Sequence, residues 1–358
     1  MPTAALNGAP LDAPARVAAG PRPGRMPRRV AAFWTVAAAA FVFVPGHAFS
    51  EVTVLRLGNV LVIATAAFGL HVLVNWAGEL SLAQAAFVGL PGLLVAKLSF
   101  DHQLDPVVLI PLGLAVGALV GGAVGLPALR AKGIYVVIVT IAAELGIESF
   151  FYTKSWLVGA GGLEQVATPK LGPWVFRTNR SLFPVLAVVF VAVVVVMRAV
   201  YHSKVGRGLV WVRENPDAAA AAGVPVASYR TIAYVLAGAL AGLSGALAAT
   251  WVGRISPGSY GLQQSLSYLI IVVIGGPGFL GGTIVAAFLL TGSNLVIPQG
   301  IKILDYIGPL GLVYTLTSAK GGFNRAGREI AAKWRNRGKH HPPSTEPAVP
   351  AEPAPAVL

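Results

Sequence analysis

The sequence predicts an all-α, polytopic membrane protein of about ten transmembrane helices (8–10), with both termini in the cytoplasm. Three observations lead to this prediction: the composition, a series of long apolar segments, and an uneven distribution of lysine and arginine. Of the 358 residues, 55% are hydrophobic and only 11% are charged, and the mean hydropathy is +0.71. A soluble domain carries about 25% charged residues, so this chain lacks the charge that covers a globule in water.

Ten apolar segments are candidates to cross the bilayer, a distance that an α-helix of about 20 residues covers. They are Val30–Val44, Val52–Asn75, Leu80–Leu98, Val107–Leu126, Ile134–Phe151, Leu182–Ala199, Thr231–Trp251, Leu266–Gly275, Gly281–Ile297 and Ile303–Thr317. The eighth segment is too short to cross alone, so the number of crossings within residues 263–300 stays open.

The basic residues support an even number of crossings with both ends inside. With a cytoplasmic N-terminus, 19 of the 27 lysines and arginines fall on the cytoplasmic side and 6 on the other side, as the positive-inside rule requires. The net charge of +13 lies in loops and tails instead of on one folded basic face. This distribution argues against a nucleic-acid partner.

The chain divides into three regions by composition. Residues 1–29 form a basic tail that we expect to be disordered, residues 30–319 form the membrane domain, and residues 320–358 form a basic, then Pro/Ala-rich, cytoplasmic tail. The first apolar segment also has features of a signal peptide, so cleavage within residues 1–50 stays open, although nine further segments favour an uncleaved helix. With no cysteine and no His/Asp/Glu set at metal-ligand spacing, we expect no metal site, no cofactor and no catalytic residues.

The long cytoplasmic loop at residues 202–230 contains a short helix with marked ends. Asn215 can cap its N-terminus, and Pro216 suits the first helical position. Asp217 lies at the positive end of the helix dipole, and Gly223 can adopt the left-handed conformation that ends a helix. Such a short helix is marginally stable in water, so we expect it to dock against a partner.

This loop resembles the EAA loop of bacterial ABC importer permeases, with Asp in place of the usual Glu. The matching residues are Asp217, Ala218, Ala219 and, after three more residues, Gly223. In that family the short helix seats in a cleft of the ATPase subunit. The resemblance therefore implies that residues 216–223, with Glu214 just before them, couple this chain to an ATPase.

Three other segments resemble branched-chain amino acid permeases of the M type. They are Gly78–Phe87, the stretch from Leu129 to Thr140, and Ile255-Ser256-Pro257 followed by glycines up to Gly281. Within the first, Glu79 and Gln84 depart from the usual Gln and His, which puts the substrate in doubt more than the mechanism.

The resemblance implies an importer permease in the bacterial cytoplasmic membrane, and not an enzyme. Its partners would be two ABC ATPase subunits that use the ATP, a second, H-type permease as heterodimer partner, and an extracytoplasmic substrate-binding protein. The cargo would be a branched-chain or other hydrophobic amino acid. A urea or short-amide importer is the alternative that the two departures allow. A secondary transporter or an intramembrane enzyme is more distant, because neither would use an EAA-like loop. A homodimer of permeases also stays open.

Polar residues at membrane depth are candidates for the substrate pathway, because ionisable groups there usually face a cavity or a partner. One group lies around an expected helix break at Ala77-Gly78 and comprises Asn75, Glu79, Ser81 and Gln84. Ser81 and Gln84 would share a helix face, whereas Glu79 could instead sit in a cytoplasmic turn. Glu144 is a further candidate, with pairing to Lys97 or Arg56 as its structural alternative. We expect His71 to be buried and hydrogen-bonded.

The glycine run at residues 275–282 is not a phosphate-binding loop, because it lacks the Lys-Ser/Thr pair of a nucleotide site. It favours a closely packed helical hairpin. The packing residues would be Gly275, Gly276, Gly278 and Gly281.

Overall fold

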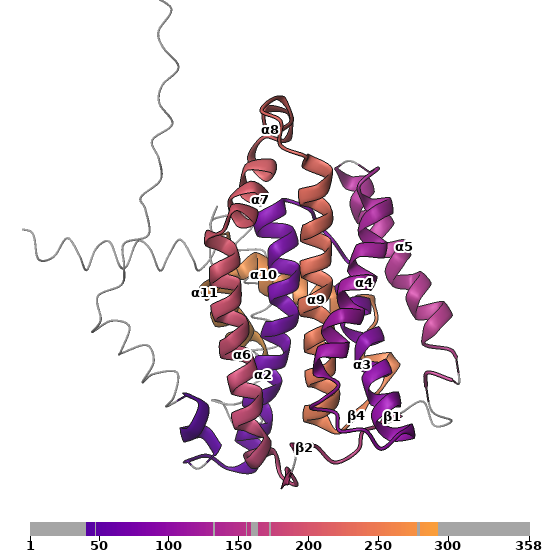
Figure 1. The fold of residues 1–358 in the computed structure, drawn as a ribbon, viewed down its shortest axis with the longest axis vertical. Helices are drawn as coiled ribbons and strands as arrows, with labels where there is room; N and C mark the ends of the chain where they lie inside the picture. Colours follow the sequence, from indigo (N-terminus) through magenta and orange to yellow (C-terminus); the bar gives the residue numbers. More distant parts are fainter. Residues whose placement is uncertain are drawn as a thin grey trace, which may run out of the picture. The chain divides into compact units, whose positions relative to one another are not determined.

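Helices make up nearly all of the regular structure in the part of the chain that the computed structural model describes (Figure 1). The described residues are 41–46, 48–131, 133–154, 156–158, 164–171, 173–277 and 280–292. Apart from Phe41 they belong to one compact unit, Val42–Leu358. The predicted tails at 1–29 and 320–358, most of the first span and all of the tenth lie outside the described residues.

Ten α-helices, one π-helix, one 3₁₀-helix and two small strand pairs follow one another in the described ranges. The longer helices are α2 (Glu51–His71), α3 (Gln84–Asp101), α4 (Ile110–Ala128), α5 (Ile134–Phe151), α6 (Asn179–His202) and α9 (Val226–Val252). The shorter ones are the π-helix η1 (Val72–Ala77), α7 (Lys204–Glu214), α8 (Pro216–Ala221), the 3₁₀-helix η2 (Pro257–Ser259), α10 (Leu262–Gly275) and α11 (Gly281–Thr291). Strand β1 (Glu164–Gln165) pairs antiparallel with β4 (Arg254–Ile255), and β2 (Lys170–Leu171) pairs with β3 (Trp174–Val175).

Five helical stretches in the described ranges are long and apolar enough to cross a membrane. They are Glu51–Ala77, in which η1 extends α2, and helices α4, α5, α6 and α9. The predicted third span is wrong at its start, because the helix begins at Gln84 instead of Leu80. Helix α10 has 14 residues and α11 has 11, so neither reaches the length of a span within these ranges. The chain is thus a multi-pass helical membrane protein.

Helices α2 and α9 form the centre of this unit. In the most apolar stretch of each, 83% and 78% of residues are buried, compared with 17% in α5. A helix that is apolar all round belongs in a protein core or in lipid, and both settings occur here. Helix α9 packs against α2, α3 and α4, whereas α5 exposes Ile134, Tyr135 and Ile138, which in a membrane face lipid or another protein.

Glycines bring α4 and α9 into backbone contact. A Cβ on Gly117 would lie 2.2 Å from the Gly238 oxygen, and a Cβ on Gly242 would lie 2.2 Å from the Gly113 oxygen. Gly121 meets the same face of α9 one turn further along α4. Small residues four apart allow membrane helices to approach this closely.

The predicted cytoplasmic loop at 202–230 contains one more helix than expected. Ser203 begins α7, because its Oγ accepts hydrogen bonds from the Val205 and Gly206 amides. Helix α7 carries charged residues among its apolar ones, so a search for apolar spans does not detect it. Asn215 then separates α7 from α8.

Candidate functional site

The chain leaves helical geometry between α2 and α3, at the predicted break. Helix α2 passes into the π-helix η1, and Gly78 follows it with φ +75°. Residues 79–83 are not helical, and α3 begins only at Gln84. Backbone groups in such a break must find partners inside the protein, because lipid offers none.

Side chains from α5 and α10 satisfy the amides at the start of α3. The Leu82 amide donates to Thr140 Oγ1 at 3.1 Å, the Ala85 amide to Ser265 Oγ at 2.7 Å, and the Ala86 amide to Glu144 Oε2 at 2.9 Å. The first amides of a helix have no partner within the helix, and a carboxylate is favoured at this end of the dipole. Glu144 and Ser265 therefore cap α3 from outside its own sequence.

The expected pairing of Glu144 with Lys97 or Arg56 is wrong. Glu144 is fully buried, and its Oε2 also accepts from Ser265 Oγ at 3.3 Å. Lys97 Nζ instead lies 3.2 Å from Asp101 Oδ1, one turn along α3. Lys97 and Asp101 lie near the C-terminal end of α3, whereas Glu144 contacts the N-terminal end of this helix.

Asn75 joins η1 to the turn between α10 and α11. Its Nδ2 lies 3.0 Å from His71 Nδ1 and 3.4 Å from the Gly276 oxygen. His71 Nδ1 also lies 2.7 Å from Thr283 Oγ1 on α11. His71 is fully buried, which confirms the expectation of a buried, hydrogen-bonded histidine.

Ser81 and Gln84 do not share a helix face, because Ser81 precedes the helix. Ser81 Oγ accepts from the Ala83 amide at 3.3 Å, and Gln84 Nε2 donates to the Ala66 oxygen at 2.7 Å. Both side chains are fully buried. The Ser81 contact stabilises the break itself, and the Gln84 contact joins the start of α3 to α2.

Glu79 pairs with Arg230 near the start of α9. Its Oε1 lies 2.8 Å from Arg230 Nε, and the Glu79 side chain is 9% exposed. The N–H of that nitrogen does not form an aligned hydrogen bond, so the contact is an ion pair. Burial raises the pKa of Glu79 above its usual value, and Arg230 opposes this shift only in part.

Helix α8 extends beyond the neighbouring ends of α7 and α9 (Figure 1). Asn215 caps its N-terminus, since Oδ1 accepts from the Ala218 amide at 2.9 Å. Gly223 follows its end with φ +82°. The residues expected to couple to an ATPase divide into two groups: Ala219 is buried, and the others, Glu214, Asp217, Ala218 and Gly223, are exposed.

The predicted glycine hairpin lies between α10 and α11. Helix α10 ends at Gly275, Gly276 has φ +75°, and α11 begins at Gly281. A Cβ on Gly275 would lie 2.7 Å from the Thr283 amide nitrogen, so the two helices meet closely. Gly278 lies outside the described residues.

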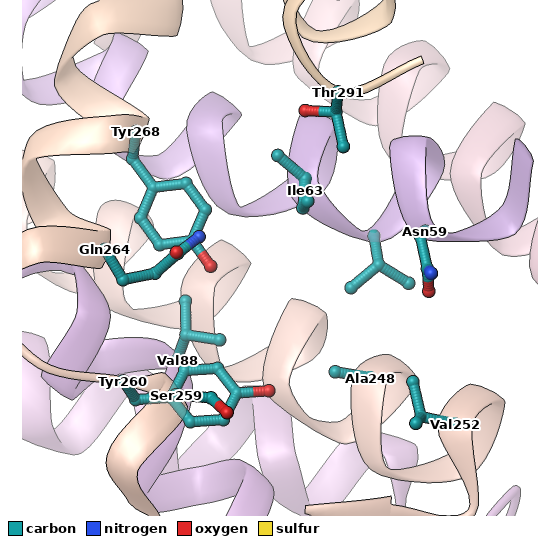
Figure 2. Close-up of a pocket in the computed structure, with 11 residues that line it drawn as sticks. Asn59, Ile63, Val88, Ala248, Val252, Ser259, Tyr260, Gln264, Tyr268 and Thr291 are labelled. Carbon is teal, nitrogen blue, oxygen red and sulfur yellow. The ribbon is translucent and has the colours of Figure 1, made fainter. Parts of the chain in front are cut away.

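A cavity of about 270 Å³ lies among the helices near the break (Figure 2). It is bordered by α2, α3, α9, η2, α10 and α11. Figure 2 shows Gln264 and Tyr268 on one side of this space and Asn59 on the other. The lining residues are Asn59, Val62, Ile63, Val88, Ala248, Val252, Ser259, Tyr260, Gln264, Tyr268 and Thr291.

The lining combines aliphatic side chains with neutral amides and hydroxyls. Among the described residues that line it, none is Asp, Glu, Lys, Arg or His. The Tyr260 hydroxyl, like that of any tyrosine, is protonated at neutral pH and can donate, and burial raises its pKa further. The volume lies near the lower end of the roughly 300–1,000 Å³ range of ligand pockets. The cavity thus suits a small molecule that is partly aliphatic and carries no net charge.

The predicted pathway residues Asn75, Glu79, Ser81, Gln84 and Glu144 do not line this cavity. They hold the helix break beside it, where Val88 lies one turn beyond Gln84 on α3. Sequence reasoning missed the lining residues because six elements each contribute only a few of them. The Ile255-Ser256-Pro257 segment was the one available signal, since Ser259 and Tyr260 lie two and three residues after Pro257.

The described residues contain no group of three or more His, Asp or Glu side chains that could hold a metal ion.

Comparison with known proteins gives a family match over most of the chain. The family described as "Branched-chain amino acid transport system / permease component" matches residues 52–312. The described break, cavity and α8 all fall within these residues.

Two curated relatives are high-affinity branched-chain amino acid transport system permease proteins named LivM. The one from Salmonella typhimurium is 28% identical and the one from Escherichia coli is 27% identical, each over 63% of this chain and 59% of the relative. The fructose import permease protein FrcC of Rhizobium meliloti is 25% identical over 71% of each chain. The match thus spans less than two thirds of the LivM relatives. A comparison with solved structures gave no match.

Proposed function

The chain belongs to the permease family of branched-chain amino acid transport systems, and from this membership we propose that it is the membrane-spanning subunit of an ATP-driven importer. The observation that carries the proposal is α8, a short helix with capped ends and an exposed Asp217-Ala218 surface. Seated in a cleft of an ATPase subunit, α8 would move when ATP binds. The Ala-rich face leaves room for close contact with such a cleft.

The partners follow from this role. Two ABC ATPase subunits use the ATP, so this chain needs no cofactor of its own. A second, H-type permease completes the membrane pathway, and an extracytoplasmic binding protein delivers the substrate. The complex lies in the bilayer of a bacterial cytoplasmic membrane, with about ten crossings and both termini inside.

The cavity supports a branched-chain or other hydrophobic amino acid as substrate. An aliphatic side chain would lie against Val62, Ile63 and Val88. A net-neutral zwitterion would find side-chain amides at Asn59 and Gln264 and a hydroxyl at Ser259. A sugar offers hydroxyl groups on every side and fits this aliphatic wall less well. A urea or short-amide importer is the alternative, although Glu79 pairs with Arg230 and Gln84 Nε2 donates to the Ala66 oxygen.

Reconstitution tests the proposal directly. The permease pair, the ATPases and the binding protein are placed in proteoliposomes, and ATP-dependent uptake of radiolabelled leucine is measured against unlabelled leucine, fructose or urea. We expect uptake that requires ATP and that leucine alone suppresses. Suppression by fructose or urea would reassign the substrate, and uptake without ATP would refute the importer role.

Variants at two matched glycines test α8 itself. Gly223→Val should abolish uptake and ATPase co-purification, because a bulky residue changes the end of α8. Gly253→Val is the control, because Gly253 has a similar φ of +74° and equally open surroundings at the C-terminal end of α9. Equal loss in both variants would mean that backbone strain explains the result, and the coupling assignment would be withdrawn.

A further inference from the structure

Arg213 connects the segment that carries α8 to the helix break. It lies in the last turn of α7, three residues before α8 begins at Pro216. Its Nη1 donates to the backbone oxygen of Asn75 in η1. Its Cγ lies 2.5 Å from the position that a Cβ on Gly78 would occupy, so glycine at 78 makes room for this side chain.

The contact caps the C-terminal end of η1. The last carbonyls of a helix have no partner within the helix, and a positive charge is favoured at this end of the dipole. The Asn75 oxygen is one of these carbonyls. A movement of α7 would therefore carry the end of η1 with it or leave a carbonyl without its partner in a water-poor region.

The polar contacts continue from Asn75 to the turn between α10 and α11. Its side chain reaches the Gly276 oxygen and His71, and His71 in turn contacts Thr283. Gly276 and Thr283 belong to the turn and helix that follow α10. Helices α10 and α11 also carry Gln264, Tyr268 and Thr291, which line the cavity. A series of contacts thus runs from α7 to the α10–α11 turn. From there, α10 and α11 themselves continue to the cavity wall.

We propose that Arg213 is a positioning residue through which α8 controls the cavity, with the π-helix η1 as the element that changes conformation; this inference rests on the proposed function. A π-helical turn is an uncommon geometry that needs support from its surroundings. Here η1 is held from two sides, by Arg213 on α7 and by the α10–α11 turn through Asn75. A shift of α7 would alter the contact between Arg213 and the Asn75 oxygen. The resulting change in η1 would then alter the contact of the Asn75 side chain with the α10–α11 turn.

The test compares Arg213→Ala with Arg207→Ala in the complete complex. Arg207 lies on the same helix and donates to the His202 oxygen at 2.6 Å, so the control removes the same charge and a similar bond without touching η1. Both variants should co-purify with the ATPases. We expect Arg213→Ala to hydrolyse ATP at a near wild-type rate while leucine uptake per ATP falls roughly 5- to 150-fold, the range of typical coupling. Arg207→Ala should keep the wild-type ratio.

Two further variants separate coupling from folding. Asn75→Ala and Thr283→Val interrupt the onward contacts and leave α7 unchanged, and each should lower uptake per ATP. Because the contacts act in series, uptake per ATP in the Arg213→Ala/Asn75→Ala double variant should be no lower than in the more impaired of the two single variants. Arg213→Lys, which keeps the charge and a donor, should restore part of the uptake.

Four outcomes would overturn the inference. Normal uptake per ATP in Arg213→Ala would refute it alone, as would losses that multiply in the double variant. Equal losses in the Arg207→Ala control would assign the effect to charge on α7. Failure of the wild-type complex to take up any substrate with ATP would instead refute the proposed function, and this inference with it.

Discussion

Replacing Gly117 by alanine tests the close packing of α4 on α9. The new Cβ would lie 2.2 Å from the Gly238 oxygen and 2.6 Å from the Gly242 Cα. Both obstacles are backbone atoms, so no side chain can rotate away. Carbon and oxygen atoms in close helix contacts are normally about 3.3 Å apart, and α4 must therefore retreat by about 1 Å.

The cost follows from this displacement. A gap of 0.5–1 Å removes roughly a quarter to a half of each atom pair's attraction, and overpacking of this kind costs about 3 kcal/mol at the upper end of its range. Alanine recovers up to about 1 kcal/mol of helix preference over glycine. The net loss is therefore about 2 kcal/mol, which corresponds to a Tm lower by roughly 4–8 °C.

Thermal unfolding in detergent, followed by tryptophan fluorescence, measures the effect. Gly146→Ala is the matched control, because a Cβ on this α5 glycine would meet nothing within 4 Å. That variant should gain about 0.5–1 kcal/mol and raise Tm by roughly 1–4 °C. A Gly117→Ala protein as stable as the wild type, or two variants with the same shift, would refute the packing argument.

Three further predictions concern the ion pair and the cavity. Arg230→Gln should destabilise the protein by roughly 3 kcal/mol, the lower end of the range for an unpaired buried charge. The Glu79→Gln/Arg230→Gln double variant should lose less free energy of unfolding. Equal losses in the two variants would show that the charge on Glu79 is unimportant. The deficit of Arg230→Gln should shrink from pH 7 to pH 5, because a carboxyl whose folded pKa is raised favours the folded state at low pH and opposes it as pH rises; a deficit that grows on acidification would contradict this sign. Ala248→Leu should narrow the cavity and lower leucine uptake about tenfold more than alanine uptake; competition assays that find no change in this ratio would remove the cavity from the pathway.

Local signals in the sequence were sufficient for α8 and for the position of the break. Asn215, Pro216 and Gly223 each act within a few residues of their own position, so the ends of α8 could be predicted without a fold. The same holds for Gly78, whose freedom to take a positive φ ends η1. Helix α7 was missed because its charges hide it from a search for apolar segments. The start of α3 was predicted too early because residues 80–83 are mostly apolar but not helical.

The contacts of the site depend on residues far apart in the chain. Glu144 was identified as important, but its role as a cap for α3 depends on an amide 58 residues earlier. The cavity depends on helices that run from Asn59 to Thr291, and no local pattern in the sequence marks which side of each helix faces it. Spacing alone placed Ser81 and Gln84 on one face, since it assumed a helix that the break interrupts.

The cap of α3 also sets an order of events during synthesis. The Ala85 amide waits for Ser265, which follows 180 residues later. At about 5–20 residues per second, the ribosome adds those residues in roughly 9–36 s. Until then the Ala85 amide at the start of α3 lacks this hydrogen-bond partner. A chain that ends before α10 never supplies it. The start of α3 is therefore complete only after the ribosome has made α10.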